Sequence, residues 1–197
     1  TANAEETTPT ASNSSVAQRE RRKFNPPPAT TTTANKDHCC VCLEDLPVDA
    51  SMISRMACCG KAVHLHCKDN FFGSSLSREQ KGKCPHCQVE LPSTAEEDFE
   101  LARGWADKGK AWAQASLGNK YIFGTGIEQS YERAIEYFTL AIQYGDPNAM
   151  FGLAVMYDRG EGVTTSLEKS LELYTQAANL RHASAQNILG LKCVTGQ

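Results

Sequence analysis

Cysteine and histidine side chains crowd into one short window of this chain. Eight of the nine cysteines lie between Cys39 and Cys87, and four of the five histidines lie between His38 and His86. A Cys-x-x-Cys turn directs two sulfur atoms at one ion, so each such pair is half of a tetrahedral zinc site. Four ligand pairs therefore predict two structural zinc ions. The pairs are separated by 15, 4 and 16 residues and are Cys39/Cys42, Cys58/Cys59, His64/Cys67 and Cys84/Cys87.

Two neighbouring side chains compete for places in these pairs. Cys40 could replace Cys39, although only Cys39 leaves two residues before the next ligand. His66 could replace His64, which has the matching gap to the cysteine that follows. We expect surface or packing roles for the remaining candidates, which are His38, Cys40, His66 and His86.

The segment from residue 37 to 92 is too short to fold around a good hydrophobic core. A structural zinc ion contributes about 10–16 kcal/mol in small peptides, which rivals the total stability of a domain. We therefore expect this segment to fold only with zinc bound. Both sites would have four protein ligands and no open position, which argues against zinc-based hydrolysis.

The segment resembles the RING finger family, in the variant with Cys-Cys-Gly-Lys at the second pair, on the runs CCVC, ACCGKAVHLHC and CPHC. The resemblance implies a small α+β domain in which the pairs interleave as a cross-brace. The first zinc would be held by Cys39, Cys42, His64 and Cys67, and the second by Cys58, Cys59, Cys84 and Cys87.

The RING resemblance also implies a function. Such proteins dock a ubiquitin-conjugating enzyme and hold its ubiquitin thioester in a reactive pose, which is catalysis by positioning without a covalent intermediate. The resemblance implies enzyme contacts at Val41, at Phe71 or Phe72, and at Pro85. Gln88 is the fifth expected contact, at the position after the last ligand where many active members have a basic residue that restrains ubiquitin. We assign no catalytic residue.

Residues 93–197 carry an internal repeat. Ala113, Leu117, Tyr121, Gly124 and Gly126 match Ala149, Leu153, Tyr157, Gly160 and Gly162 at a shift of 36 residues. Units at 111–146 and 147–182 follow a half unit at 95–110, and a partial third unit spans 183–197. Apolar residues at helical spacing around glycine-rich turns predict an all-α solenoid of helix-turn-helix repeats. Cys193 matches the two tyrosines, so we expect it to be a packing residue.

The repeats resemble the Sel-one-like subfamily of the tetratricopeptide-type repeats, on AQASLGNKYIFGTG and AMFGLAVMYDRGEGV. That resemblance implies a protein-binding scaffold. An unrelated array of helical hairpins is the alternative.

The first 36 residues read as a disordered tail rich in threonine and proline. The basic run at residues 19–23 is either a solvated charge run or a nuclear-import signal. A net charge of -3 argues against nucleic-acid binding. The sequence contains no run of 18 apolar residues, so it predicts no membrane-spanning helix. Clustered thiols without disulfides favour a reducing compartment, the cytoplasm or the nucleus.

Two functions remain open from the sequence. The first is a RING-type ubiquitin ligase whose repeats recruit the protein substrate. The second is a non-catalytic adaptor in which a zinc-stabilised interaction module is fused to a repeat scaffold.

Overall fold

The computed structural model of the chain describes residues 38–47 and 52–195. The tail expected at residues 1–36 lies outside the described residues. Residues 38–92, the cysteine module, hold one antiparallel strand pair, in which Ile53 lies opposite His64, and two short helices. These elements are β1 (Ile53–Arg55), β2 (Ala62–His64), α1 (Leu65–Gly73) and α2 (Arg78–Lys81).

The cysteine module has a very small core. Met56 and Val63 are buried together with Cys39, Cys67 and Cys84. Three of these five buried side chains are predicted metal ligands, so the apolar contribution to the stability of this module is slight.

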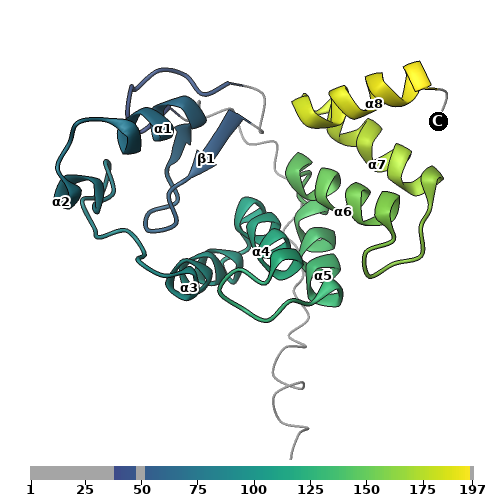
Figure 1. Ribbon diagram of the computed structural model, residues 1–197, viewed down its shortest axis with the longest axis horizontal. Helices are drawn as coiled ribbons and strands as arrows, with labels where there is room; N and C mark the ends of the chain where they lie inside the picture. The colour runs from purple at the N-terminus through teal and green to yellow at the C-terminus, as the bar shows by residue number, and fades with distance from the viewer. Residues whose placement is uncertain (1–37, 48–51, 196–197) are drawn as a thin grey trace, which may run out of the picture. The chain divides into compact units, whose positions relative to one another are not determined.

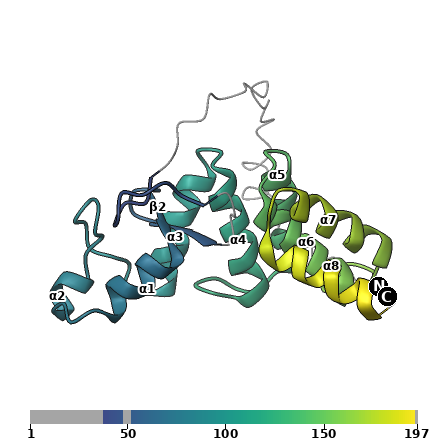
Figure 2. The same ribbon diagram turned by 90° about the horizontal axis from the view of Figure 1, so that it is seen from above.

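Helices alone make up the rest of the described chain. They follow one another in chain order from α3 to α8 (Figures 1 and 2), as the predicted solenoid requires. Their bounds are α3 (Ala95–Ala106), α4 (Ala111–Phe123), α5 (Tyr131–Ile142), α6 (Pro147–Arg159), α7 (Leu167–Asn179) and α8 (Ala183–Thr195). No helix in the described part of the chain is both long and apolar enough to cross a membrane.

The second helix of each unit begins at the same kind of cap. Thr94, Ser130 and Ser166 precede α3, α5 and α7 at intervals of 36 residues, and each side chain accepts a backbone N–H three residues on. Such caps satisfy one of the unpaired donors at a helix start. The helix α3 therefore begins in the same way as the second helices of the two complete units.

The repeat core is built from small residues around a few large ones. Ala134, Ala141 and Ala149 are fully buried around Phe138, and Leu117 is fully buried in the neighbouring cluster. Short side chains at these positions let adjacent helices approach closely, as the alanine pattern predicts.

The expected packing role of Cys193 is wrong, because the structure exposes this side chain on α8. Its equivalents Tyr121 and Tyr157 are partly buried against neighbouring helices.

The cysteine module contacts the first helices of the solenoid. The indole Nε1 of Trp105 donates a hydrogen bond to the carbonyl oxygen of Ala57, at 2.8 Å. Gly60 lies so close to the same ring that a Cβ there would be 3.3 Å from it. The guanidinium of Arg55 lies over the ring of Trp112, 5.9 Å from its centroid.

Candidate metal centre

Two short ribbons with the same backbone geometry present the Cys-x-x-Cys pairs. In each ribbon the first cysteine donates its N–H to the carbonyl five residues on, and its carbonyl accepts the N–H four residues on. The bonds are Cys39 N to Glu44 O (2.9 Å), Leu43 N to Cys39 O (3.0 Å), Cys84 N to Val89 O (2.8 Å) and Gln88 N to Cys84 O (3.0 Å). An isolated bridge closes each ribbon, between residues 38 and 45 and between residues 83 and 90.

A left-handed residue follows the second cysteine in both ribbons. Leu43 has φ 64° and Gln88 has φ 59°. This conformation costs a non-glycine residue about 1–2 kcal/mol, and it turns the chain so that both thiols of a pair face the same point. Strain of this kind is typical of ligand-binding loops.

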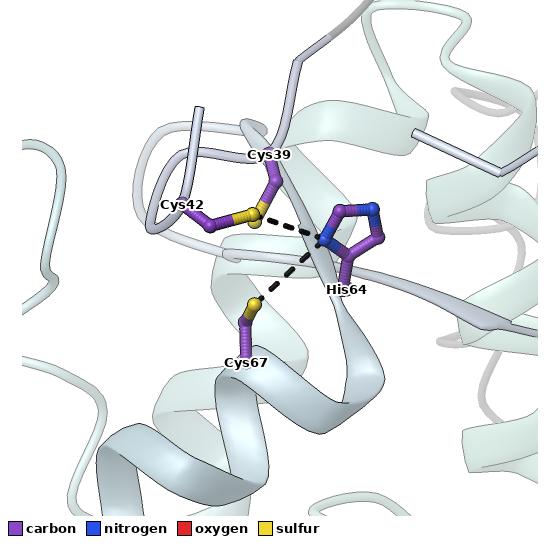
Figure 3. Close-up of side chains that lie close together, drawn as sticks. All are labelled: Cys39, Cys42, His64 and Cys67. Carbon is purple, nitrogen blue, oxygen red and sulfur yellow. Dashed lines mark hydrogen bonds between the residues drawn. The ribbon is translucent and has the colours of Figure 1, made fainter. Parts of the chain in front are cut away.

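The first candidate metal group is formed by Cys39, Cys42, His64 and Cys67, whose ligand atoms all lie within 4.8 Å of one another. Strand β2 ends at His64, α1 begins one residue later, and Figure 3 shows their side chains converging with the first ribbon. The sulfur atoms of Cys42 and Cys67 lie 3.3 and 3.7 Å from Nδ1 of His64.

The contact made by Nε2 of His64 indicates which ring nitrogen carries the proton. Its Nε2 lies 3.2 Å from the backbone carbonyl oxygen of Asp45. A carbonyl can only accept, so Nε2 carries the proton and Nδ1 directs a lone pair at the three sulfur atoms. Metal-binding histidines commonly have such an orienting partner. Because that partner is a backbone carbonyl, no side-chain pattern in the sequence could have revealed it.

The second candidate group is formed by Cys58, Cys59, Cys84 and Cys87, again with all ligand atoms within 4.8 Å of one another. The adjacent pair lies on a turn in which Gly60, at φ 70°, donates its N–H to the carbonyl of Met56 at 2.7 Å.

The spacing of the donor atoms fits tetrahedral zinc. Sulfur atoms at about 2.3 Å from a tetrahedral ion lie about 3.8 Å apart. The sulfur atoms of Cys58 and Cys87 are 3.5 Å apart, and those of Cys59 and Cys84 are 3.9 Å apart. Thiolate and imidazole donors in this number also match the preference of zinc.

The thiols interact strongly with their surroundings. Burial acts to raise the pKa of Cys39, but the backbone N–H groups of Cys42, His64 and Val41 outweigh it and lower the pKa to about 6. Burial, followed by the neighbouring thiols, raises the pKa of Cys67 to about 12. Without a metal, ionised neighbours in the first group thus oppose the ionisation of Cys67, and a bound divalent cation would offset that repulsion among its three thiols.

The competing side chains lie outside both groups. Cys40 is half-buried, and its N–H donates to the carbonyl of Ala62 at 3.0 Å. His66 is exposed, stacks on His64 with ring centroids 5.0 Å apart, and lies beside Cys67. His38 forms an exposed ion pair with an aspartate, and His86 is exposed.

Three of the five residues with expected enzyme contacts line one groove. Phe71, Pro85 and Gln88 surround a space of about 580 Å³ together with Leu76. The neighbouring Phe72 lines a different cleft. Val41 is exposed but is not part of the groove. The sequence did not predict Leu76 as part of this groove, because it is a single leucine in a polar stretch.

Stacked helix pairs with left-handed glycine turns define a repeat solenoid, and the family comparison identifies it. Residues 113–146 and 147–182 match the family model of the Sel1 repeat. These bounds agree with the two complete units predicted from the shift of 36 residues, so the Sel-one-like interpretation is confirmed. The RING-type interpretation of the cysteine module stays a prediction.

Curated relatives share parts of this chain. Protein sel-1 homolog 2 of Homo sapiens is 44% identical over 74 residues, which are 37% of this chain and 11% of that protein. HRD3B of Arabidopsis thaliana, an ERAD-associated E3 ubiquitin-protein ligase component, is 34% identical over 72 residues, which are 36% of this chain and 12% of that protein. The chain thus covers only about a tenth of the length of these relatives.

Two solved structures share the fold. The Sel1 repeat protein from Oxalobacter formigenes has a TM-score of 0.52 and 22% identity, over 67% of this chain and 48% of that one. The antigen c5321 of uropathogenic Escherichia coli has a TM-score of 0.51 and 25% identity, over 67% of this chain and 25% of that one.

Proposed function

We propose that this chain is a protein–protein interaction adaptor, in which a zinc-stabilised module is attached to a Sel1-repeat solenoid. The observation that carries the proposal is the solenoid itself. Its units bury their apolar surface against each other, and in the described part of the chain neither candidate metal group lies on its helices. Repeat solenoids of this kind offer extended surfaces for binding other proteins.

Zinc has a structural role in this proposal. Each candidate group offers four protein donors and leaves no coordination position for water or substrate. The metal would therefore neutralise the clustered thiolates and hold the two ribbons, β2 and α1 together. The similarity to HRD3B, described as a component of a ubiquitin ligase, supports a scaffolding role in an assembly.

A second candidate function is ubiquitin transfer by the cysteine module. The groove formed by Phe71, Leu76, Pro85 and Gln88 favours it, since a half-buried aromatic ring and a proline lie beside the second metal group. A ubiquitin-conjugating enzyme would be the partner there. Gln88 disfavours strong activity, because its exposed amide donates to the carbonyl of Pro85 and offers no positive charge to ubiquitin.

One experiment separates the two functions. The zinc-loaded chain is mixed with a panel of ubiquitin-conjugating enzymes charged with ubiquitin, and discharge of the thioester is followed with lysine as acceptor. The adaptor proposal expects no acceleration by any enzyme. Acceleration that is lost on zinc chelation and in Phe71→Ala, but kept in Phe72→Ala, would assign ligase activity instead.

A further inference from the structure

A cleft of about 610 Å³ lies where the cysteine module meets the first two helices of the solenoid. Strand β1, helix α1, the segment after α2, and helices α3 and α4 all contribute to its walls. Its volume is in the range of sites that bind a small ligand or a short peptide. The side chains that give it chemical character are Arg55, Lys68, Phe72, Lys81, Leu91 and Trp112.

The cleft is positively charged in a chain whose net charge is -3. Lys68 and Lys81 are half-buried in its wall, and within residues 38–47 and 52–195 neither forms an ion pair. The ammonium of Lys68 donates only to the hydroxyl of Ser54, at 3.2 Å. The acidic residue in the lining is Asp98, and its carboxylate is already paired with Lys120.

Aromatic and aliphatic side chains line the same cleft. Phe72 keeps 38% of its surface exposed, and Trp112 is half-buried. Leu91 and Ala102 add apolar area to the same lining. A ligand that fits must therefore combine negative charge with apolar side chains.

Contacts between the cysteine module and the solenoid preform the cleft. The bond from Trp105 to Ala57 and the close approach of Gly60 to the same indole ring fix β1 and its turn against α3. A surface that is already ordered loses less conformational entropy on binding.

We propose that this cleft binds a segment of a partner protein that carries both acidic and apolar side chains. Carboxylates of the segment meet Lys68 and Lys81, and an aromatic or aliphatic side chain packs on Phe72 and Trp112. The proposal rests on the adaptor function and names its binding surface and the class of its partner. It does not depend on ubiquitin transfer.

The test uses the zinc-loaded chain and a fluorescein-labelled peptide of alternating glutamate and leucine, with fluorescence anisotropy as the readout. Binding of this peptide is expected to weaken with added salt, and its lysine–leucine counterpart is expected not to bind. Lys68→Glu with Lys81→Glu should weaken binding by about tenfold or more. The control variant Lys110→Glu with Lys169→Glu has the same change in net charge at two exposed lysines outside the cleft, and should bind as the parent does.

Circular dichroism verifies the fold of each variant, and Lys68→Gln with Lys81→Gln replaces the double reversal if that variant does not fold. Equal binding of both peptides, or an equal loss in the control variant, overturns the proposal. Competition by inorganic phosphate or by an oligonucleotide at lower concentration than the peptide also overturns it, in favour of a phosphate site. No conjugating enzyme is present, so a negative result leaves the ubiquitin-discharge experiment unaffected.

Discussion

The ring of Phe138 lies directly against the backbone of Gly118, where a Cβ would come within 2.5 Å of ring atom Cε1. The same ring also meets Gly152, where a Cβ would be 2.6 Å from Cζ. Phe138 is fully buried on α5, while the two glycines lie on α4 and α6. One aromatic ring thus connects three helices, and the two missing side chains make room for it.

Substitution of either glycine by alanine should therefore destabilise the solenoid. Gly118→Ala and Gly152→Ala each insert a methyl group into a filled space, and we expect a loss of about 1–3 kcal/mol in the free energy of unfolding. Urea unfolding followed by circular dichroism measures it. Gly104→Ala is the control, because a Cβ there meets nothing within 4 Å and α3 should gain up to about 1 kcal/mol. Partial rescue of Gly118→Ala by Phe138→Leu would locate the clash, and unchanged stability of both glycine variants would contradict it.

The turn between helix pairs suggests a stabilising substitution. Gly109 and Gly145 have φ 73° and 74°, and Arg181, at the same place in the third copy, has φ 62°. Arg181→Gly should relieve a left-handed conformation that costs a non-glycine residue about 1–2 kcal/mol. The larger conformational entropy of glycine in the unfolded state offsets part of this gain in stability. We expect a small rise in the melting temperature. Gly145→Arg is the reverse change at a site where a Cβ meets nothing within 4 Å, and it should lower the melting temperature.

The repeat could be predicted from the sequence because each unit repeats the same local requirements at one interval. Small residues at Ala113 and Ala149 and left-handed glycines at Gly124 and Gly160 each have a direct structural reason. The caps at Thr94, Ser130 and Ser166 recur at the same interval of 36 residues, so the starts of these helices could also have been predicted from the sequence.

Three of the ligand pairs could be predicted for a similar reason, since a two-residue gap determines which side chains can face one point. The grouping of the four pairs into two sites came from the RING resemblance instead. The groove at Phe71 and the cleft at Lys68 could not be predicted from the sequence. Phe71 and Phe72 are adjacent on α1, so their side chains point about 100° apart, and the sequence alone does not say which one meets Pro85. The cleft joins Lys68 to Trp112, and only the tertiary packing brings these distant positions together.

Metal removal should separate the two parts of the chain. Elemental analysis of the purified protein should find about two zinc ions per chain, as two four-donor groups require. Chelation should unfold the cysteine module and leave the helical signal of α3–α8 in circular dichroism. The indole of Trp105 should become more hydrated as its bond to Ala57 is lost, and its fluorescence should shift to longer wavelength. Cys84→Ser should reduce the zinc content, whereas Cys40→Ser, outside both groups, should not. Retention of two zinc ions by Cys84→Ser would contradict the assignment.

The cap of α6 predicts a pH dependence of stability. Asp146 accepts the N–H groups of Asn148 and Ala149 at 2.9 and 3.0 Å. Burial raises the pKa of this carboxyl, and the two N–H groups, His182 and Arg55 oppose the shift without cancelling it. An acid with a raised pKa in the folded state favours folding below its unfolded pKa of about 3.9, and this contribution is lost as pH rises through the folded pKa.

Asp146→Asn keeps an oxygen acceptor for the cap and removes the buried charge. We expect it to be more stable than the parent at pH 7 and equally stable at a pH below about 3.9, where Asp146 is protonated in both states. Asp146→Ala also removes the acceptor and should be about 1 kcal/mol less stable than Asp146→Asn at both pH values. Urea unfolding at the two pH values measures all three proteins. A loss of stability in Asp146→Asn at pH 7 would show instead that Arg55 and His182 stabilise the charged carboxylate by more than its burial costs.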